Sequence, residues 1–474
     1  MKLRVYSTPL KKLNVLMLVF AGVFTLAGCE ENSGSVINEQ TGKVLEEAKK
    51  PNIILVMTDD QGYGDFSMNN NPIVNTPNIE DLAAESQRFT NFHVDPTCSP
   101  TRAALLSGQY SLRAGVWHTV MGRHMLSDEH HILPEILGDA GYNTAIIGKW
   151  HLGDNYPFRP QDQGFQYVLS HGVGQSPDYW ENDQFDDIYY LNGKEKQYNG
   201  FATDVWFDEA ISYIDGQAKQ ENPCFLYLST NAPHTPWRAP EKYIEPYREM
   251  GLEEDLAKFY GMITNIDDNM ARLRKAMRDN KIEDNTIFIF MTDNGSSMAT
   301  KSNGEPLHRL SDEVKLAIEA KTGKKLNTLN SYMRDGKAST YEGGHRVPFF
   351  IRWPNGNLGE PGEFSDLSAH VDLLPTLLDL TGIKAKEIDT DGISLVNLLK
   401  DGTALPDRTM VVTNQRVLDP DPQRPYSVMQ GNWRYVHGTA TGGVELYDLS
   451  TDPGQTNDIS AQHPERVANM TKAY

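Results

Sequence analysis

Four short apolar runs, each followed at once by polar residues, constrain the fold of this chain more than any other feature. The runs lie at residues 53–57, 144–147, 225–228 and 287–291. They are rich in β-branched and aromatic residues and alternate with helical patterns, which is typical of buried parallel strands in a doubly wound α/β sheet. Because ligand sites in such sheets lie outside the carboxyl ends of the strands, we expect the residues after these runs to meet at one edge.

Acidic and amide residues follow two of the runs. Asp59 and Asp60 come after the first run, and Asp293 and Asn294 come after the fourth. All four offer oxygen ligands, which suit a hard cation such as Ca²⁺ or Mg²⁺ and do not suit zinc or copper. Carboxylates within about 4 Å of each other repel by roughly 4 kcal/mol per pair at an effective dielectric of about 20, and a divalent ion removes that cost. One acidic pair could serve as a turn or cap, but its repetition favours a metal site.

Basic residues and histidines follow the other two runs. Lys149 and His151 come after the second run, His234 after the third, and Lys337 later in a glycine-containing turn. Each of these alone could be an ordinary surface or hydrogen-bonded residue. Placed together after predicted strands, they are candidate anion ligands and proton carriers. Screening over about 8 Å lets such local charges outweigh the distant net charge of the protein.

The segment Cys98-Ser99-Pro100-Thr101-Arg102 indicates a helix start that could carry chemistry. Pro100 suits an early helical position, and Arg102 returns to the face of Cys98 one turn later. A helix N-terminus and a guanidinium then converge on one point, which favours an anion. The alternative is a helix start with an inert buried thiol.

The rest of the chain completes an α/β organisation. We predict another strand at 347–353, a helix at 373–380 and an amphipathic helix at 311–325. Short strand-like pieces at 410–413, 426–429, 433–437 and 444–449, separated by glycine-containing turns, predict a small antiparallel sheet. The predicted parts are therefore a main domain over 51–404, with a large and mostly parallel central sheet flanked by helices, and a small C-terminal α+β subdomain over 405–474.

The N-terminus resembles a bacterial lipoprotein signal. An apolar run at 13–27 follows four basic residues and ends in Leu26-Ala27-Gly28-Cys29. This resemblance implies a signal peptide over 1–28, lipidation of Cys29, and a flexible tether over 29–50 that leads to an envelope protein anchored to the outer membrane, either periplasmic or surface-exposed. A plain secretory signal and an uncleaved anchor are the alternatives, although the run is short for a membrane span.

Charge and cysteine usage limit the partners. The formal net charge of −20 argues against nucleic acid and against anionic membrane as partners. The chain has three cysteines, so lipidation of Cys29 would leave Cys98 and Cys224. Cys224 lies in an apolar run and is expected to be a small core residue.

Several motifs occur together in one order. Cys98 to Arg102 matches the pattern C-x-P-x-R, and the other matching segments are Thr58-Asp59-Asp60, Gly148-Lys149-Trp150-His151-Leu152-Gly153, Ala232-Pro233-His234, Thr292-Asp293-Asn294-Gly295, Gly336-Lys337 and Glu342-Gly343-Gly344-His345-Arg346-Val347-Pro348. In these motifs the chain resembles type I sulfatases of the alkaline-phosphatase-like superfamily from residue 51 to its end. Two segments depart from the family pattern: Thr101, where Ser is common, and Leu106-Ser107-Gly108-Gln109, where Leu-Thr-Gly-Arg is commoner.

The resemblance implies a modified residue, a metal and a set of roles. A maturation enzyme would oxidise Cys98 to formylglycine (3-oxoalanine), and Asp59, Asp60, Asp293, Asn294 and residue 98 would hold one divalent ion, Ca²⁺ rather than Mg²⁺. A hydroxyl of the hydrated aldehyde would attack sulfur while Asp293 helps to accept its proton. Arg102, Lys149 and Lys337 would hold the sulfate oxygens, and His234 would protonate the leaving alcohol. His151 would then take the proton of the second hydroxyl, which expels sulfate.

The substrate is less closely specified. His171, Trp237 and Arg238, together with Tyr179 and Trp180, are candidates for stacking on a sugar or for pairing with a uronate or second sulfate, although loop packing explains them as well. An anchored envelope sulfatase fits the breakdown of a sulfated polysaccharide, with ulvan, carrageenan or fucoidan ahead of host glycosaminoglycans. The alternatives are a small-molecule arylsulfatase, a phosphonate or phosphodiester hydrolase of the same superfamily, and a non-catalytic glycan-binding lipoprotein.

Overall fold

The computed structural model of this chain describes residues 49–172, 183–298, 310–324, 332–385, 388–438 and 442–474. The predicted signal at 1–28, Cys29 and nearly all of the predicted tether lie outside the described residues, as do Tyr179 and Trp180. None of the helices within those ranges is both long and apolar enough to cross a membrane.

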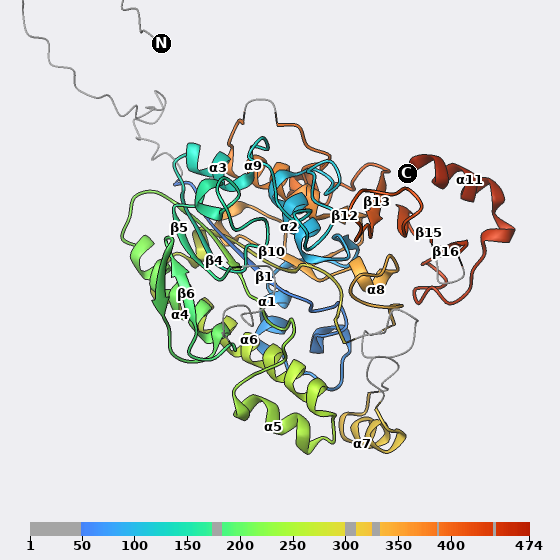
Figure 1. Cartoon of the computed structure of the whole chain (residues 1–474), viewed down its shortest axis with the longest axis horizontal. Helices are drawn as coiled ribbons and strands as arrows, with labels where there is room; N and C mark the ends of the chain where they lie inside the picture. The colour runs from blue at the N-terminus through green and yellow to red at the C-terminus, as the bar shows by residue number, and fades with distance from the viewer. Residues whose placement is uncertain (1–48, 173–182, 299–309, 325–331, 386–387, 439–441) are drawn as a thin grey trace, which may run out of the picture. The chain divides into compact units, whose positions relative to one another are not determined.

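A ten-stranded sheet forms the centre of the protein from residue 50 onward (Figure 1). Its strands are β1 (Asn52–Thr58), β2 (Gln87–Phe89), β4 (Asn143–Gly148), β5 (Tyr167–Ser170), β6 (Ile188–Leu191), β7 (Lys194–Gln197), β8 (Cys224–Ser229), β9 (Thr286–Thr292), β10 (Phe349–Arg352) and β11 (Gly362–Phe364). They lie in the order β11-β2-β10-β9-β1-β8-β4-β5-β6-β7. The five central strands from β9 to β5 are parallel, while β10 and β6 run antiparallel beside them.

The four predicted strands are confirmed as β1, β4, β8 and β9, each one residue longer at both ends than the apolar run. β1 lies between β8 and β9, and Ile53 pairs with Phe225 on one side and Ile287 on the other. Their side chains are buried on both faces of the sheet, which is why these strands are apolar without alternation. The predicted α/β class, with its mostly parallel central sheet, is confirmed.

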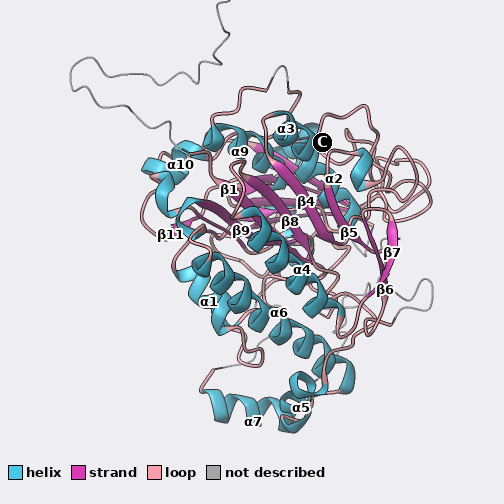
Figure 2. Ribbon diagram, turned by 90° about the vertical axis from the view of Figure 1, so that its left-hand side faces the viewer, coloured by secondary structure: helices cyan, strands magenta, loops and turns pink. Residues whose placement is uncertain are grey.

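Helices cover both faces of the sheet (Figure 2). They are α1 (Pro77–Ala84), α2 (Cys98–Ser107), α3 (Leu133–Asp139), α4 (Ala202–Gln217), α5 (Glu241–Glu249), α6 (Glu254–Asp279), α7 (Asp312–Thr322), α8 (Glu342–His345), α9 (Leu373–Thr381), α10 (Val396–Asp401) and α11 (Pro464–Ala473). Ile54 and Val56 of β1 share a core with α1, α4 and α6, whereas Ile53 and Leu55 share a second core with α2, α3 and α9. The helices predicted at 311–325 and 373–380 are confirmed as α7 and α9.

A small antiparallel sheet follows near the C-terminus, as predicted. It consists of β13 (Thr409–Thr413), β14 (Tyr426–Gln430), β15 (Trp433–His437) and β16 (Val444–Asp448), paired in that order. Met470 of α11 packs against residues of this sheet, and together they form a hydrophobic cluster separate from the cores of the main sheet. A further pair, β3 (Phe92–His93) and β12 (Ser368–Ala369), is parallel. The boundary between the main domain and the C-terminal subdomain, predicted between residues 404 and 405, stays a prediction.

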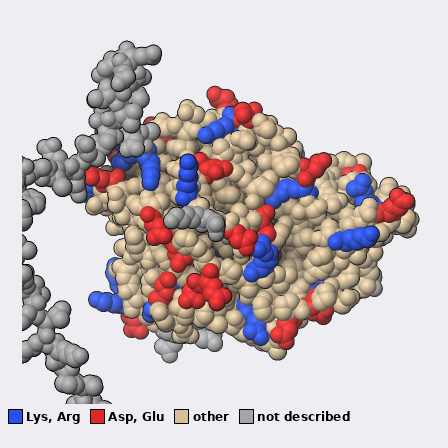
Figure 3. Space-filling model, turned by 90° about the horizontal axis from the view of Figure 1, so that it is seen from above, with Lys and Arg blue, Asp and Glu red and all other residues tan. Residues whose placement is uncertain are grey.

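Charged side chains of both signs are interspersed on the face of the protein shown in Figure 3. The net charge of −20 is therefore not gathered into a single acidic surface on this face. Screening limits the reach of exposed charges to about 8 Å at physiological salt. The groups that surround a site consequently decide which ligand it attracts.

A buried ion pair joins the small sheet to the main body. Arg434 of β15 donates from Nε to Glu342 Oε1 at 2.7 Å and from Nη2 to Asn91 Oδ1 at 2.8 Å. Arg346 approaches the other carboxylate oxygen of Glu342 at 3.2 Å. Burial alone would raise the pKa of Glu342, but the neighbouring arginines hold that pKa well below its usual range. Glu342 is therefore a buried anion whose charge depends on Arg434.

Replacing Arg434 with methionine is expected to lower the free energy of unfolding by about 3–5 kcal/mol. The reason is that the buried Glu342 carboxylate then keeps Arg346 but loses the positive charge of Arg434. Urea unfolding of purified wild type and variant measures the difference. Arg272→Met is the matched control, since Arg272 pairs with Asp208 at the surface and its loss should cost under about 1 kcal/mol. Equal losses in the two variants would contradict the assigned role of the buried pair.

Candidate active site

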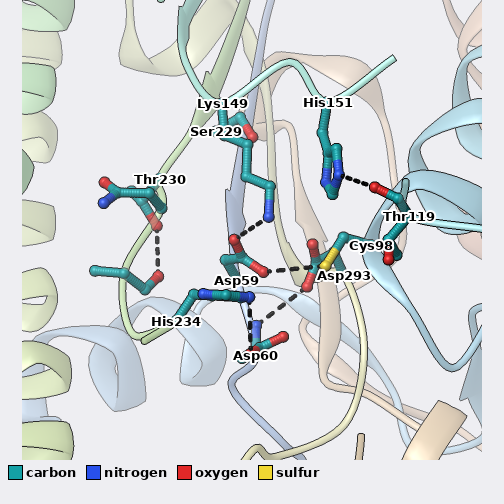
Figure 4. A network of polar contacts seen from close by, with 12 residues as sticks. Asp59, Asp60, Cys98, Thr119, Lys149, His151, Ser229, Thr230, His234 and Asp293 are labelled. Carbon is teal, nitrogen blue, oxygen red and sulfur yellow. Dashed lines mark hydrogen bonds and ion pairs between the residues drawn. The ribbon is translucent and has the colours of Figure 1, made fainter. Parts of the chain in front are cut away.

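The loops after the four predicted strands meet at the carboxyl edge of the sheet (Figure 4). Backbone hydrogen bonds hold them together. Asp293 N donates to Thr58 O at 3.0 Å, Asp59 N donates to Ala232 O at 3.1 Å, and Lys149 N donates to Ser229 O at 2.7 Å. The site is therefore made of segments far apart in the sequence and is fixed by the register of β1, β4, β8 and β9.

Helix α2 places Cys98 over this edge. The helix begins at Cys98, as predicted, and every one of its residues is buried. The Cys98 Sγ lies 3.5 Å from Asp59 Oδ1. Burial raises the pKa of the Cys98 thiol to about 12, so it is held as a thiol and not as the nucleophilic thiolate. Cys98 and Cys224 are both free.

Three buried carboxylates each pair with a different cation. Lys149 Nζ contacts Asp59 Oδ2, and Lys337 Nζ lies 2.7 Å from Asp60 Oδ1. The third pair joins Arg102 to Asp293, with Nη2 at 2.8 Å and Nε at 3.2 Å from Oδ2. These pairs balance the carboxylate charges before any bound ion is counted, so a divalent cation would leave a surplus of positive charge for an anionic substrate.

The carboxylates of the site titrate differently because their neighbours differ. Burial raises the pKa of Asp59 and of Asp60. The neighbouring lysine, Lys149 for Asp59 and Lys337 for Asp60, outweighs burial only together with further groups such as His234, and both pKa values end below the usual range. Burial and the nearby Asp59 raise the pKa of Asp293 despite Arg102. Asp59 and Asp60 are thus the stable anions, while Asp293 is the more easily protonated carboxylate.

Two residues of the site adopt left-handed backbone conformations that are uncommon outside glycine. Asp60 has φ 66° and His151 has φ 62°. Just before Lys149, Gly148 has φ 106°, and a Cβ there would lie 2.0 Å from Ser229 O. β4 can approach β8 this closely only with glycine at that position, and this approach places Lys149 beside Asp59.

The two histidines each have one nitrogen fixed by a backbone carbonyl. His151 Nε2 donates to Thr119 O at 2.8 Å, which leaves Nδ1 buried and without a partner among the described residues. Burial lowers the pKa of His151 well below its usual value, so the neutral ring offers Nδ1 as a proton acceptor. His234 Nδ1 donates to Thr235 O at 2.7 Å, and its Nε2 faces Asp60 Oδ2 at 3.6 Å.

The donor set fits a hard divalent cation. Ligand atoms of Asp59, Asp60, Cys98 and His234 lie within 4.8 Å of one another. Asn294 Nδ2 donates to Asp60 Oδ1 at 2.9 Å, and its Oδ1 is buried with no hydrogen-bond partner in the part of the chain that the structure describes. An orphaned carbonyl oxygen beside two carboxylates is the arrangement expected of an oxygen-ligated metal site. Asp293 lies beside this cluster, since its Oδ1 accepts from Asp60 N at 3.1 Å.

Arg102 was predicted to bind a sulfate oxygen, but in the structure its guanidinium is enclosed by protein atoms. It is fully buried, and besides Asp293 it donates to Lys149 O, to the Tyr227 hydroxyl and to Ser229 Oγ. These bonds tie α2 to β8 and to the loop after β4. In this structure Arg102 supports Asp293, and its contact with sulfate stays a prediction.

The predicted substrate residues lie in different environments. His171 is buried close to Lys149 and Asp59, and burial lowers its pKa to about 4. Trp237 is partly buried against the hydrophobic core. Arg238 pairs with Asp183, with 2.7 Å between Nη1 and Oδ2. His171 is thus the one of the three that these contacts bring to the catalytic edge, and the substrate roles of all three stay predictions.

Sequence reasoning missed three groups that shape the site. They are the carbonyl of Thr119, the hydroxyl of Tyr227 and the hydroxyl of Ser229. Ser229 ends β8 just as Thr58 ends β1, so its place after an apolar run was a usable signal. Tyr227 lies within a buried strand, and Thr119 lies in a loop without a motif. The sequence therefore carries no signal that marks either residue as part of the site.

Comparisons with known proteins place the site in a family. A profile described as Sulfatase matches residues 51–383, and one described as N-sulphoglucosamine sulphohydrolase, C-terminal, matches residues 335–473. The N-acetylgalactosamine-6-sulfatase of Rattus norvegicus is 30% identical over 446 residues, which cover 88% of this chain and 78% of that protein. The N-acetylgalactosamine-6-O-sulfatase of Bacteroides thetaiotaomicron is 25% identical over 98% of both chains.

Solved structures agree. The crystal structure of Ps i-CgsB in complex with k-i-k-neocarrahexaose superposes with a TM-score of 0.75 and 26% identity, covering 90% of this chain and 92% of that chain. The phosphonate monoester hydrolase of Agrobacterium radiobacter, with a TM-score of 0.61 and 18% identity, shares the fold. The profile, the relatives and the carboxylate-rich edge of the sheet together show that this chain belongs to the sulfatase family and is a sulfuric ester hydrolase.

Proposed function

We propose that this protein removes sulfate from a sulfated polysaccharide or its oligosaccharides, using formylglycine made from Cys98 and one divalent metal ion. The observation that carries the proposal is the placement of Cys98 beside Asp59, under the cations Lys149 and Lys337, in a chain of the sulfatase family.

Two relatives support a carbohydrate substrate. One is described as an N-acetylgalactosamine-6-O-sulfatase, and the other is a structure with a neocarrahexaose bound. The second favours an algal glycan such as carrageenan, with ulvan and fucoidan as further members of that class. A small aromatic ester is the competing substrate, because arylsulfatase A of Homo sapiens is 29% identical over 469 residues.

Conversion of Cys98 is supported by its environment. A thiol whose pKa is raised to about 12 by burial is a poor nucleophile at neutral pH. A hydrated formylglycine would supply a hydroxyl that can accept the sulfuryl group and a second hydroxyl whose deprotonation allows sulfate to leave. We therefore include the maturation enzyme that oxidises Cys98 among the partners of this protein.

The remaining side chains bind charge and move protons. Lys149 and Lys337, both close to Cys98, would hold sulfate oxygens, while their pairing with Asp59 and Asp60 keeps them in place. His234 Nε2 would protonate the alcohol oxygen that leaves sulfur. His151 Nδ1, neutral and unpartnered, would take the proton of the second hydroxyl. Lys149 and His151 are buried, and burial strengthens the electrostatic interactions that they make.

The metal would be held by oxygens. Asp59, Asp60 and Asn294 provide them, with Asp293 and residue 98 adjacent. Such an ion would supply Lewis-acid polarisation of the sulfate ester and would offset carboxylate repulsion. We favour Ca²⁺ over Mg²⁺, because Ca²⁺ accepts irregular sets of oxygen ligands whereas Mg²⁺ demands near-ideal octahedral geometry.

The cellular location belongs to the proposal as well. The sequence Leu26-Ala27-Gly28-Cys29 after a short apolar run supports a signal cleaved before Cys29 and a lipid anchor in the outer membrane. Such an anchor would hold the enzyme where polysaccharide fragments enter the cell envelope. Mass spectrometry of the mature N-terminus tests this, and an unlipidated or uncut Cys29 would refute it.

Matured enzyme is expected to release sulfate from at least one defined sulfated oligosaccharide with a higher kcat/KM than from an aryl sulfate, because the glycan contacts more of the site. A panel of carrageenan, ulvan, fucoidan and glycosaminoglycan oligosaccharides, assayed for free sulfate, measures this. Aryl phosphonate esters serve as the comparison for phosphonate hydrolysis. Efficient hydrolysis of the aryl sulfate with none of any oligosaccharide would refute the carbohydrate proposal.

Cys98→Ser is expected to abolish multiple turnover and to leave either inactive protein or a trapped sulfated serine. The serine side chain has one hydroxyl and lacks the second hydroxyl that is needed to expel sulfate. Sulfate release over many enzyme equivalents and intact-mass measurement detect these outcomes. Cys224→Ala is the control, since Cys224 is a core residue of β8 and its variant should turn over. Sustained turnover by the Cys98→Ser variant would contradict this mechanism.

Removal of divalent ions is expected to reduce the rate by at least about 100-fold, since the ion offsets buried carboxylate charge and polarises the sulfate ester. The test is dialysis against a chelator followed by titration with Ca²⁺ or Mg²⁺. We expect Ca²⁺ to restore activity, and Asp60→Asn to weaken that restoration. An unchanged rate after metal removal, verified by elemental analysis, would contradict the metal role.

A further inference from the structure

The loop that joins β13 to β14 lies against a turn of the catalytic body. The Trp117 Nε1 donates to Val417 O at 3.0 Å, and the Arg123 Nε donates to Leu418 O at 2.7 Å. Between those two anchors, the Thr119 carbonyl accepts the hydrogen bond from His151. The same turn therefore contacts a histidine of the active site on one side and the loop of the small sheet on the other.

The start of this loop is fixed beside another active-site group. Asn414 Nδ2 donates to the carbonyl of Ala338, the residue after Lys337. The Ala338 N in turn donates to Pro96 O at 2.8 Å, two residues before Cys98. Residues 414–418 thus run from the neighbourhood of Lys337 to the turn that holds His151, which places the segment along the rim of the sulfate site.

Arg416 lies in the middle of this segment. It is exposed, and it has no ion pair with any residue in the ranges that the structure describes. Most arginines in the described ranges have an ion pair, including Arg123, whose Nη2 lies 3.8 Å from Asp419 Oδ1. An unpaired guanidinium at the rim of a site for an anionic substrate is free to bind a further anion in bidentate geometry.

Two histidines accompany Arg416. His118 Nδ1 accepts backbone N–H bonds from Thr119 at 2.7 Å and Val120 at 3.2 Å, so its ring carries the proton on Nε2 and can donate from there. Burial and the nearby Arg416 lower the pKa of His118. The ring of His124 lies 5.9 Å from that of His151, and His118 lies close to both His124 and Arg416.

The surface around these groups also offers apolar area. Met121 is 67% exposed and Leu418 is 59% exposed, one on the turn and one on the loop. Exposed apolar side chains beside an unpaired cation suit an amphipathic ligand such as a sugar with an anionic substituent. The nearby acids are Asp419, which faces Arg123, and Asp154, which is close to His124.

We propose that Arg416, with His118 and His124, forms a second anion subsite that binds a sulfate or carboxylate group carried by the substrate in addition to the sulfate that is removed. This inference rests on the proposed polysaccharide function and makes it more specific. The substrate it describes is an oligosaccharide with at least two anionic groups, one in the sulfate site and one near the loop of the small sheet. Arg416 supplies the charge, and His118 supplies an N–H donor from Nε2.

The test compares three oligosaccharides of equal length that carry one sulfate, two sulfates, or one sulfate and one uronate carboxylate. Matured wild type is expected to prefer one of the two doubly anionic substrates. Arg416→Ala should reduce that preference in kcat/KM by about tenfold, mainly through KM, because the lost contact binds substrate without touching the reacting sulfur. Arg416→Lys should keep part of the preference, since charge remains but the bidentate fork is lost.

Arg466→Ala is the matched control. Arg466 also lacks an ion pair among the described residues, and it lies over the ring of Trp433. Trp433 pairs with Gln430, whereas the loop with Arg416 follows Thr413, which pairs with Tyr426. The control therefore removes an unpaired charge from the opposite end of the same small sheet and should leave the preference unchanged.

The remaining outcomes either overturn the subsite or identify the anion that it binds. Equal kcat/KM of wild type for all three oligosaccharides, an equal fall for all three in Arg416→Ala, or an equal effect of Arg466→Ala would overturn the subsite. A preference of wild type for the uronate alone would identify carboxylate as the second anion, and a preference for two sulfates alone would identify sulfate. Absence of sulfate release from every oligosaccharide would instead overturn the polysaccharide proposal, and the subsite with it.

Discussion

The structure depends on the burial of three carboxylates at one edge of a parallel sheet. Asp59, Asp60 and Asp293 can lie this close only because Lys149, Lys337 and Arg102 pair with them one to one. Removing one partner of a buried pair costs about 3–5 kcal/mol, so each pair fixes the position of the loop that carries it. A divalent ion added to this balanced set would turn the edge into an anion site within a strongly acidic protein.

The fold explains why these charges meet. β1 lies between β8 and β9, and β4 lies beyond β8, so four strand ends deliver their following residues to the same place. Helix α2 then covers this edge with its first residue, Cys98, and Arg102 one turn later ties the helix to β8 and β9 through Ser229 and Asp293. Cys98 is buried at this edge, and its burial keeps the thiol protonated.

The sequence was sufficient for the parts of the site that have local signals. Apolar runs predicted the central strands to within one residue at each end, and the polar residues after them marked the edge where Asp59, Lys149 and Asp293 meet. The position of Arg416 could not be predicted, because it depends on how the small sheet docks against residues 117–123. The same holds for the carbonyl of Thr119, which acts through backbone placement, and for the pairing of Arg102 with protein atoms, which depends on the packing of α2 against β8.

Arg434 secures the small C-terminal sheet to the main body through Glu342, and the first loop of that sheet carries Arg416, the residue of the proposed second anion subsite.

In the proposed mechanism, a converted Cys98 and a divalent ion share the carboxylate edge. A crystal structure of matured protein grown with Ca²⁺, with anomalous data, tests it most directly. We expect an anomalous peak within about 2.3–2.6 Å of oxygens of Asp59 and Asp60, next to density for a hydrated aldehyde at residue 98. An active preparation with a plain thiol at residue 98 and no peak between these carboxylates would contradict it.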